Sequence, residues 1–370
     1  MNRAEVSVDL DAVRHNCRLL LDAAGAQSSL CAVVKADAYG HGVLPVAQAA
    51  LDGGATWLAV ATAGEALGLR AHGFKCPVLV MGALESSEIA ELLDQRCDMV
   101  VWTYEFLEAI ESCSGKDRTA RVHIKLDTGM GRLGASSPDL AVGLASRATE
   151  SEAVELIGLM THLATADQHQ SDFALEQLKR FELWVKDVKE FAPSAVAHAA
   201  NSAATLDLPN AGFDMVRCGI AIYGLDPFGV NPADNRLRPA LSLRSFVASI
   251  RTVHAGQSVG YGRGFVAEVD SEIATIPIGY ADGVRRSLGG QISVLIRGSR
   301  VPVVGRVSMD NTSLYLADNS LEVAVGDEVV LIGEQATEQV IVEDWANAAE
   351  TINYEIVTSI GSRPKRRYFG

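Results

Sequence analysis

A lysine placed directly behind a short apolar run is the first residue whose type and position could do chemistry. Lys35 follows the run Cys31–Val34 and precedes Ala36-Asp37-Ala38-Tyr39-Gly40-His41-Gly42. An amine at the end of a buried strand is partly desolvated, so it loses its proton easily and can condense with an aldehyde. Lysine is also common at exposed strand ends, and position alone leaves both interpretations open.

Two later segments could bind an anion. Asn201 and Ser202 follow one apolar run, and Gly219 and Ile220 follow another. A hydroxyl and backbone N–H groups in such loops can hold a phosphate, although each loop by itself is also an ordinary turn. Combined with an amine at Lys35, they indicate a cofactor that carries both an aldehyde and a phosphate, which is pyridoxal phosphate.

A glycine-rich segment offers a competing interpretation. Gly129, Gly131 and Gly134 form a G-x-G-x-x-G pattern behind a predicted strand. As a dinucleotide fingerprint the pattern is weak, because the next helix is predicted to begin only near Ser137. Nicotinamide binding is therefore much less favoured than pyridoxal phosphate. Arg132, inside the pattern, is better suited to bind a carboxylate through its guanidinium.

A histidine and a tyrosine complete the candidate set. His162 follows the apolar run Leu156–Met160 and could order a hydrogen-bond chain, although a lone buried histidine is often only structural. His162 and His169 lack further ligands at recognisable spacing, so no metal site is predicted. Tyr261 lies in Gly260-Tyr261-Gly262, where the glycines allow either a close approach to a ligand or an ordinary turn.

The elements that must position these residues repeat as strand and helix. Eight short apolar runs alternate with amphipathic segments, and the candidate residues other than Tyr261 follow the runs at their carboxyl ends, where barrel active sites form. The pattern predicts the α/β class, with an N-terminal (β/α)8 TIM-type barrel, although an open doubly wound sheet would look similar locally. The predicted strands are Cys31–Val34, Trp57–Val60, Val78–Met81, Met99–Trp102, Val122–Leu126, Leu156–Met160, Ala195–Ala199 and Asp214–Cys218, and helices are predicted at Ser86–Arg96, Tyr104–Ser112 and Ser171–Phe191.

A second domain follows the Pro-containing stretch Asp226–Pro239. Its β-branched runs, broken by Gly and Asp, predict a mostly antiparallel β-domain over residues 237–370, after a barrel domain over residues 1–236. Residues 4–9 alternate in polarity and could pair as a strand with this second domain. The β-domain runs are Ser271–Ile278, Ile292–Ile296, Val301–Val304, Ser313–Leu316 and Glu328–Ile332.

Composition limits the classes of partner. With 48% hydrophobic and 21% charged residues, the chain is typical of soluble globular proteins. A formal net charge of −14 would repel a phosphate backbone, so nucleic acid is not an expected partner. Six cysteines without a C-x-x-C pair fit a reducing compartment, and no signal peptide or membrane-spanning stretch is evident. We expect a cytoplasmic protein.

Taken together, these motifs resemble the alanine racemase family, the fold-type III pyridoxal-phosphate enzymes, along nearly the whole chain. The first matching stretch, residues 32–42, is by itself highly specific. Further stretches match in order: residues 125–134, 162–167, 217–224, 260–262, 277–283 and 304–310.

The resemblance implies a two-base racemisation of alanine that supplies D-alanine for peptidoglycan. Lys35 would hold the cofactor through its amine and serve the D-substrate, and Tyr261 from a partner subunit would serve the L-substrate. A planar carbanion must be reprotonated from the opposite face to invert, so two bases are needed. A homodimer with shared sites follows from this arrangement.

The resemblance also implies binding roles. Arg132 and Met309 would recognise the substrate carboxylate, with Asp310 in support, and Lys125 resembles the carbamylated lysine (N6-carboxylysine) that fixes Arg132. Arg217 would face the pyridine nitrogen, and His162 would contact Arg217 and Tyr261. The phosphate pocket would comprise Tyr39, Asn201, Ser202, Gly219, Ile220 and Tyr354.

Three alternatives remain open at this point. A serine or broad-specificity racemase is the closest, and substrate profiling would separate it from an alanine enzyme. A basic amino-acid decarboxylase has a similar architecture, but its signature regions are not evident and Tyr261 favours racemisation. A non-catalytic pyridoxal-phosphate carrier would consist of the barrel alone, whereas this chain devotes residues 237–370 to a second domain.

Overall fold

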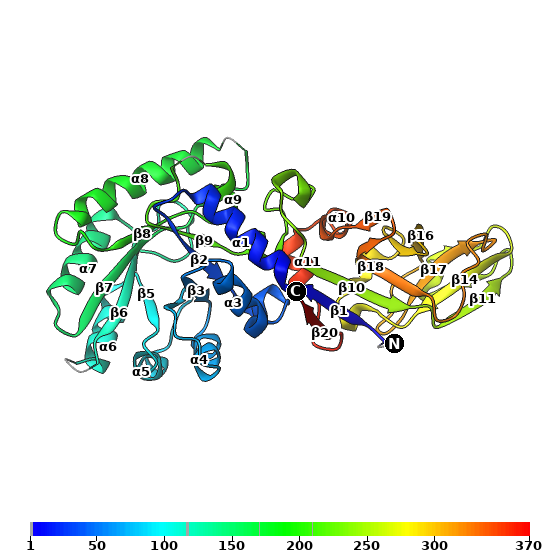
Figure 1. The fold of residues 1–370 in the computed structure, drawn as a ribbon, viewed down its shortest axis with the longest axis horizontal. Helices are drawn as coiled ribbons and strands as arrows, with labels where there is room; N and C mark the ends of the chain where they lie inside the picture. Colours follow the sequence, from blue (N-terminus) through cyan, green and yellow to red (C-terminus); the bar gives the residue numbers. More distant parts are fainter. Residues whose placement is uncertain (1–2, 116–117, 170, 209) are drawn as a thin grey trace. The chain divides into compact units, whose positions relative to one another are not determined.

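The structure, a computed structural model, describes residues 3–115, 118–169, 171–208 and 210–370. The chain forms two compact units (Figure 1). The barrel unit comprises Val13–Ala38 and Val43–Ile222, and the second unit comprises Met1–Ala12, Tyr39–Gly42 and Tyr223–Gly370. The short segment Tyr39–Gly42 therefore belongs to the second unit, although the residues on both sides of it belong to the barrel unit.

The barrel unit is built on eight parallel strands in the order β8-β7-β6-β5-β4-β3-β2-β9. Two backbone hydrogen bonds join the two ends of this order, from Asp214 N to Ala197 O at 3.0 Å and from Arg217 N to Ala200 O at 2.9 Å. The predicted barrel is thus confirmed, and the alternative of an open sheet is wrong. Each of the eight predicted runs overlaps a strand. The strands are β2 Ser29–Val33, β3 Trp57–Val60, β4 Val78–Val80, β5 Asp98–Val101, β6 Ala120–Lys125, β7 Val154–Met160, β8 Val196–His198 and β9 Met215–Cys218.

Helices cover the outer face of this sheet (Figure 1). Hydroxyl groups begin several of them: Thr62, Thr103, Ser137 and Ser171 each accept a hydrogen bond from the backbone N–H three residues later, which satisfies an otherwise unpaired donor. The helices are α1 Leu10–Ala24, α3 Val43–Asp52, α4 Ala63–Ala71, α5 Ser86–Asp94, α6 Tyr104–Cys113, α7 Pro138–Glu150, α8 Asp172–Lys189 and α9 Ser202–Asp207. Because both faces of the sheet are covered, its strands read as nearly continuous apolar runs.

The second unit is a mostly antiparallel sheet in the order β11-β14-β17-β16-β15-β18-β10-β1-β20, as predicted. β1 pairs antiparallel with β10 and parallel with β20, so the N-terminal strand lies inside this sheet. The strands are β1 Glu5–Asp9, β10 Leu241–Phe246, β11 Ser249–Val253, β12 Ser258–Val259, β13 Phe265–Val266, β14 Ser271–Ile276, β15 Ser293–Ile296, β16 Ser299–Val304, β17 Thr312–Ala317, β18 Glu328–Gln335, β19 Glu338–Val340 and β20 Lys365–Phe369, with helices α10 Val342–Ala348 and α11 Asn353–Thr358.

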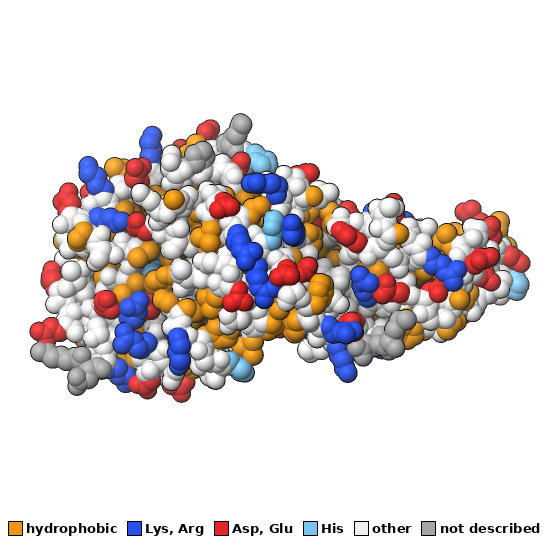
Figure 2. All heavy atoms as spheres, in the orientation of Figure 1, with side chains coloured by type: hydrophobic (Ala, Val, Ile, Leu, Met, Phe, Trp, Pro, Cys, Tyr) orange, Lys and Arg blue, Asp and Glu red, His pale blue; other side chains and the backbone are white. Residues whose placement is uncertain are grey.

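Surface charge is mixed on the visible face. Figure 2 shows basic and acidic side chains interspersed over both units rather than gathered into one patch. Within the described ranges, no helix combines the length and the apolar character needed to cross a bilayer. All six cysteines carry free thiols.

Replacing either of two glycines of the barrel unit by alanine should change the free energy of unfolding in opposite directions. A Cβ on Gly82, just after β4, would lie 2.2 Å from Ala61 O, whereas a Cβ on Gly68 inside α4 would meet nothing within 4 Å. Gly82→Ala should lower the free energy of unfolding by about 1–3 kcal/mol, because the backbone must shift. Gly68→Ala, the matched control, should raise it by about 0.5–1 kcal/mol. Urea unfolding at one fixed protein concentration measures both, and equal effects would contradict this packing.

Candidate active site

Lys35 stands at the mouth of the barrel, where β2 ends and the backbone turns left-handed. Over Ala36, Asp37 and Ala38 the φ angles are +52°, +51° and +53°. A left-handed turn costs roughly 1–2 kcal/mol per residue for L-amino acids, so other contacts must hold it. Glu65 supplies them, because one carboxylate oxygen accepts from Ala36 N at 2.6 Å and the other from Ala61 N at 2.8 Å.

The environment of Lys35 makes its ammonium easier to deprotonate than that of a lysine in water. Burial lowers the pKa of the ammonium below its ordinary value, and the charge of Arg132 lowers it further, while Glu65 acts in the opposite direction. A lysine that gives up its proton more easily is the form needed to attack an aldehyde. The local setting therefore fits the role predicted from the sequence.

Arg217, in β9, is held from several sides. Its Nη1 donates to His198 O at 2.8 Å and to His198 Nδ1 at 3.0 Å, and its Nη2 donates to Thr161 O at 2.8 Å. His162 Nδ1 lies 3.4 Å from the same Nη2, so the structure brings these two predicted residues together. Burial lowers the pKa of the guanidinium to about 10, which leaves it charged at neutral pH. A fixed buried cation is therefore a permanent feature of the barrel mouth.

The same cation affects its titratable neighbours. Burial, followed by the charge of Arg217, lowers the pKa of His162 to about 3, so this imidazole is neutral at physiological pH. Lys125, at the end of β6, is also buried, and burial together with Arg217 and Arg132 lowers its pKa to about 8. In the part of the chain that the structure describes, no carboxylate lies within ion-pair distance of the Lys125 amine. Lys125 therefore carries an amine that is partly neutral near pH 8.

The glycine-rich segment is a loop organised by Asp127. Its carboxylate accepts from the N–H groups of Gly129 and Met130 at 2.8 Å each and from that of Gly131 at 2.9 Å. Gly134 has a φ of +143°, and a Cβ there would lie 2.6 Å from Asp127 N. Helix α7 begins only at Pro138, so the loop presents Arg132 rather than a dinucleotide-binding helix terminus.

An anion cradle is present beside these groups. Asn201 caps α9 by accepting from Ala204 N at 3.0 Å, and the Ser202 hydroxyl accepts from Gly219 N at 3.0 Å. Among the described residues, the buried Ile220 N–H donates to no protein group. A buried donor without an acceptor indicates a missing partner, and a hydroxyl with neighbouring N–H groups fits a phosphate. Together with Lys35, these residues fit a cofactor with an aldehyde and a phosphate.

The remaining predicted residues belong to the second unit. There the buried Tyr39 ring packs against the Tyr354 ring with centroids 6.0 Å apart. Burial raises the pKa of Tyr39 to about 12. Tyr261 lies in a short turn between β12 and β13 and is 67% exposed, and Met309 is 52% exposed. Asp310 accepts from Arg363 Nη2 at 2.8 Å.

Several positioning residues were missed by the sequence analysis. Glu65 could have been found, because Thr62-x-x-Glu65 is a capping box, but its reach to Ala36 depends on the tertiary structure. Gln177 in α8 accepts a hydrogen bond from Ala164 N at 2.8 Å and donates one to His162 O at 3.2 Å, which orders the His162 loop. His198 gives no sequence signal, because a histidine inside a strand reads as an ordinary core residue.

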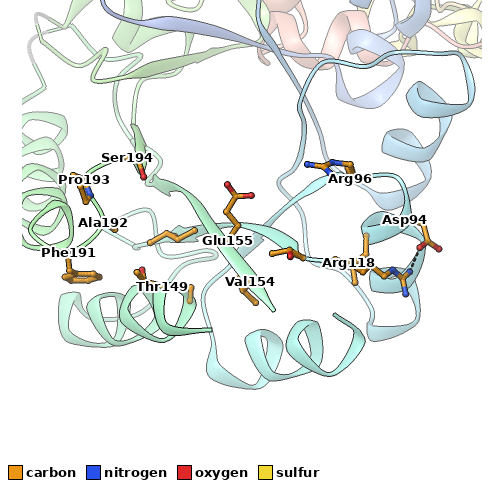
Figure 3. Close-up of a pocket in the computed structure, with 14 residues that line it drawn as sticks. Asp94, Arg96, Arg118, Thr149, Val154, Glu155, Phe191, Ala192, Pro193 and Ser194 are labelled. Atoms are coloured by element: carbon orange, nitrogen blue, oxygen red, sulfur yellow. Dashed lines mark ion pairs between the residues drawn. The ribbon is translucent and has the colours of Figure 1, made fainter. Parts of the chain in front are cut away.

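A separate hollow lies at the other end of the barrel. Its volume is about 860 Å³. Its walls include Val154 and Glu155 at the amino-terminal end of β7 and Ser194 just before β8 (Figure 3). None of the predicted site residues lines it. Barrel active sites form at the carboxyl ends of the strands, so this hollow is not the candidate active site.

Comparison with known proteins identifies the family. The family models for the N-terminal and C-terminal domains of alanine racemase match residues 8–227 and 240–368. The chain is 42% identical to alanine racemase from Mycobacterium bovis over 371 residues, covering 99% of this chain and 96% of that protein. It is 41% identical to alanine racemase from Symbiobacterium thermophilum over 365 residues, covering 98% and 96%. The crystal structure of alanine racemase from Streptomyces lavendulae covers 100% of this chain and 98% of its own, with a TM-score of 0.94 and 38% identity. This chain belongs to the alanine racemase family.

Proposed function

We propose that this protein interconverts L-alanine and D-alanine with pyridoxal phosphate as its cofactor. The observation that carries the proposal is the combination, in one barrel mouth, of an amine with a lowered pKa at Lys35 and an anion cradle at Ser202, Gly219 and Ile220. The alanine racemase family depends on pyridoxal phosphate, so the cofactor predicted from the sequence is confirmed by the family assignment. Supply of D-alanine for peptidoglycan, in the cytoplasm, stays a prediction.

The chemistry requires two proton-transferring groups. Bound pyridoxal phosphate withdraws electrons from the substrate α-carbon and makes its hydrogen acidic. Lys35 exchanges the proton at its Nζ on one face, and Tyr261 exchanges it at its Oη on the other. The lowered pKa of Lys35 supports the first role. The Tyr261 side chain is largely exposed, so its hydroxyl is available to the active site of a partner subunit.

Arg217 limits how strongly the cofactor ring withdraws electrons. The guanidinium is buried, charged and fixed by carbonyl groups, and it would be the residue that faces the pyridine nitrogen of the cofactor, as the family resemblance implies. A cation there disfavours protonation of that nitrogen, which should suppress side reactions such as transamination. Neutral His162 beside Arg217 can accept a hydrogen bond and link Arg217 to Tyr261.

Substrate recognition is assigned to Arg132 and Met309. Arg132 is exposed on the loop that Asp127 organises, and its guanidinium suits a carboxylate. The bulk of Met309 and Tyr354 favours alanine over larger amino acids. Comparing kcat/KM for alanine and serine tests this preference, and equal values would favour a broad-specificity racemase.

Replacing Tyr261 by Phe should separate the two faces. In heavy water, Y261F should lose racemisation by about 10²–10⁴-fold, because one of the two bases is gone. It should still exchange the α-hydrogen of D-alanine through Lys35, with retention of configuration. Mass spectrometry and chiral chromatography measure exchange and inversion separately. Tyr104→Phe, on the outside of the barrel in α6, is the control and should change neither. Parent-rate racemisation by Y261F would remove Tyr261 from the mechanism.

A mixing experiment tests the proposed homodimer with shared sites. If each site takes Lys35 from one subunit and Tyr261 from its partner, the Lys35→Ala and Tyr261→Phe proteins are both inactive alone. Random exchange of subunits makes half of the dimers mixed, and each mixed dimer has one intact site. Activity should therefore return to about one quarter of the parent value. No recovery, with mixed dimers shown by native mass spectrometry, would place both bases in one subunit.

Lys125 is proposed to carry a carbamate that fixes Arg132. With a pKa of about 8, roughly half of its amine is neutral at pH 8 and roughly one hundredth at pH 6. The neutral amine adds to carbon dioxide, forming an N–C bond and releasing a proton, so the carbamate should grow as pH rises. In ¹³C-bicarbonate, native protein should show a carbamate ¹³C resonance.

Two variants control this measurement. Lys125→Met should abolish the carbamate signal and lower kcat/KM by about tenfold, because Arg132 loses an anionic partner. Lys189→Met, which removes a lysine paired with Asp214 at 2.7 Å, should keep both the signal and the activity. A native spectrum without a carbamate at pH 8 would contradict the modification.

A further inference from the structure

A chain of buried polar side chains runs through the barrel interior from Arg217. Nη1 of Arg217 donates to His198 Nδ1 at 3.0 Å, and His198 Nε2 lies 2.8 Å from His123 Nδ1. His123 Nε2 lies 3.2 Å from Asp98 Oδ2, and Arg121 Nε donates to Asp98 Oδ1 at 2.7 Å. His198, His123 and Asp98 are all fully buried. None of these three residues has a role in the proposed mechanism.

The guanidinium ends fix the direction of every hydrogen bond in this chain. Arginine can only donate, so His198 Nδ1 must accept from Arg217 and its single proton must sit on Nε2. That N–H then donates to His123 Nδ1, and the proton of His123 must sit on its own Nε2 and face the Asp98 carboxylate. Burial, together with Arg217 and His123, lowers the pKa of His198 well below its ordinary range, in agreement with a neutral ring.

The chain answers a physical problem posed by Arg217. Within the described residues, no carboxylate lies within ion-pair distance of this guanidinium, which is 3% exposed. An unpaired buried charge is costly, and carbonyl groups supply only partial compensation. Through His198 and His123, hydrogen bonds connect Arg217 to the Asp98 carboxylate. Aligned hydrogen bonds polarise one another, so this carboxylate strengthens His198 Nδ1 as an acceptor.

The barrel leaves space for the histidine pair at one glycine. Gly158 in β7 lies between the strands that carry His123 and His198, and a Cβ there would be 2.2 Å from His123 Nδ1. The register of β6 against β7 shifts between Val122 and His123, directly beside this pair. The rings of Trp57 and His123 pack nearly perpendicular to each other, with centroids 5.5 Å apart. Strand geometry and packing therefore both accommodate the pair.

We propose that Asp98 and His123 are positioning residues that hold His198 with its proton on Nε2 and thereby hold the Arg217 guanidinium in place and charged. Neither residue needs to touch substrate or cofactor for this role. The consequence for catalysis rests on the proposed racemase function, whereas the proton placement does not.

Asp98→Asn is the variant that tests the direction of the chain. Both carboxylate oxygens are used: Oδ1 accepts from Arg121 Nε at 2.7 Å, and Oδ2 accepts from His123 Nε2 at 3.2 Å and from Arg121 Nη2 at 3.3 Å. Asparagine has one oxygen and one NH₂ group. If the asparagine oxygen accepts the hydrogen bond from Arg121 Nε, its NH₂ group faces His123. His123 Nε2 must then accept a hydrogen bond from that NH₂ group instead of donating one. The reversed chain then places a proton on His198 Nδ1, opposite the donating Nη1 of Arg217.

The direct readout is the protonation of the ring nitrogens. In ¹⁵N-histidine-labelled protein without added alanine, native His123 and His198 should each show a protonated Nε2 and a bare Nδ1. Asp98→Asn should move the proton of His198 to Nδ1 in a measurable fraction of molecules. Glu155→Gln is the matched control. Glu155 Oε2 lies 3.4 Å from Arg121 Nη1, and Glu155 lines the hollow of Figure 3. Its replacement removes the second carboxylate that contacts Arg121 and should leave both histidine rings unchanged.

The kinetic readout connects the chain to catalysis. Asp98→Asn should lower kcat by about tenfold or more, with a smaller change in KM, because Arg217 does not contact the amino acid in the proposed mechanism. Gly158→Ala should displace His123 and weaken the hydrogen bond from His198 Nε2–H to His123 Nδ1, seen as a changed ¹⁵N shift of both nitrogens, which keeps the proposal testable if Asp98→Asn does not fold.

Each outcome decides one part of the proposal. A native His198 that is charged or protonated on Nδ1 would overturn it, as would unchanged rings in folded Asp98→Asn. Shifted protons with an unchanged kcat would remove the catalytic link alone. Native rings as proposed in a protein that does not racemise alanine would overturn the proposed function and leave the hydrogen-bond chain standing.

Discussion

The cost of burying one guanidinium shapes the interior of the barrel. Arg217 is 3% exposed and is surrounded by carbonyl groups and imidazoles, and no carboxylate of the described residues forms an ion pair with it. Burial of a cation without full compensation is expensive, so the neighbouring groups must be polar and correctly oriented. Thr161 offers a carbonyl, His162 and His198 offer ring nitrogens, and His123 links His198 to the Asp98 carboxylate.

That cation also determines the chemistry of its neighbours. Positive charge near a lysine or a histidine disfavours the protonated form, and burial acts in the same direction. Lys125 and His162 are consequently more neutral than they would be in water. In Lys35 the same two effects, with Arg132 as the cation, favour an amine that can react. A buried cation thus lies among lysine and histidine side chains whose protonation it disfavours.

Backbone strain beside Lys35 is stabilised by the rest of the barrel. Consecutive positive φ angles after the lysine are unfavourable for alanine and aspartate, yet Glu65 in α4 anchors the first N–H of the turn. The loop that carries Arg132 is held in a comparable way by Asp127. In both places a carboxylate accepts backbone N–H groups that no helix or strand satisfies, and the reactive or binding side chain is fixed as a result.

The sequence by itself determined the barrel, the antiparallel second domain and the reactive groups, because periods of two and 3.6 residues and the residues behind each strand are local properties. It placed Lys35 and Ser202 at strand ends and set aside the glycine-rich motif for the right reason, the late start of α7. The tertiary structure alone decided what surrounds Arg217. His123 and His198 come from strands 75 residues apart, and their contact depends on Gly158 and on a register shift. Pairing across a closed barrel depends on strand order and register, which no local pattern of residues encodes.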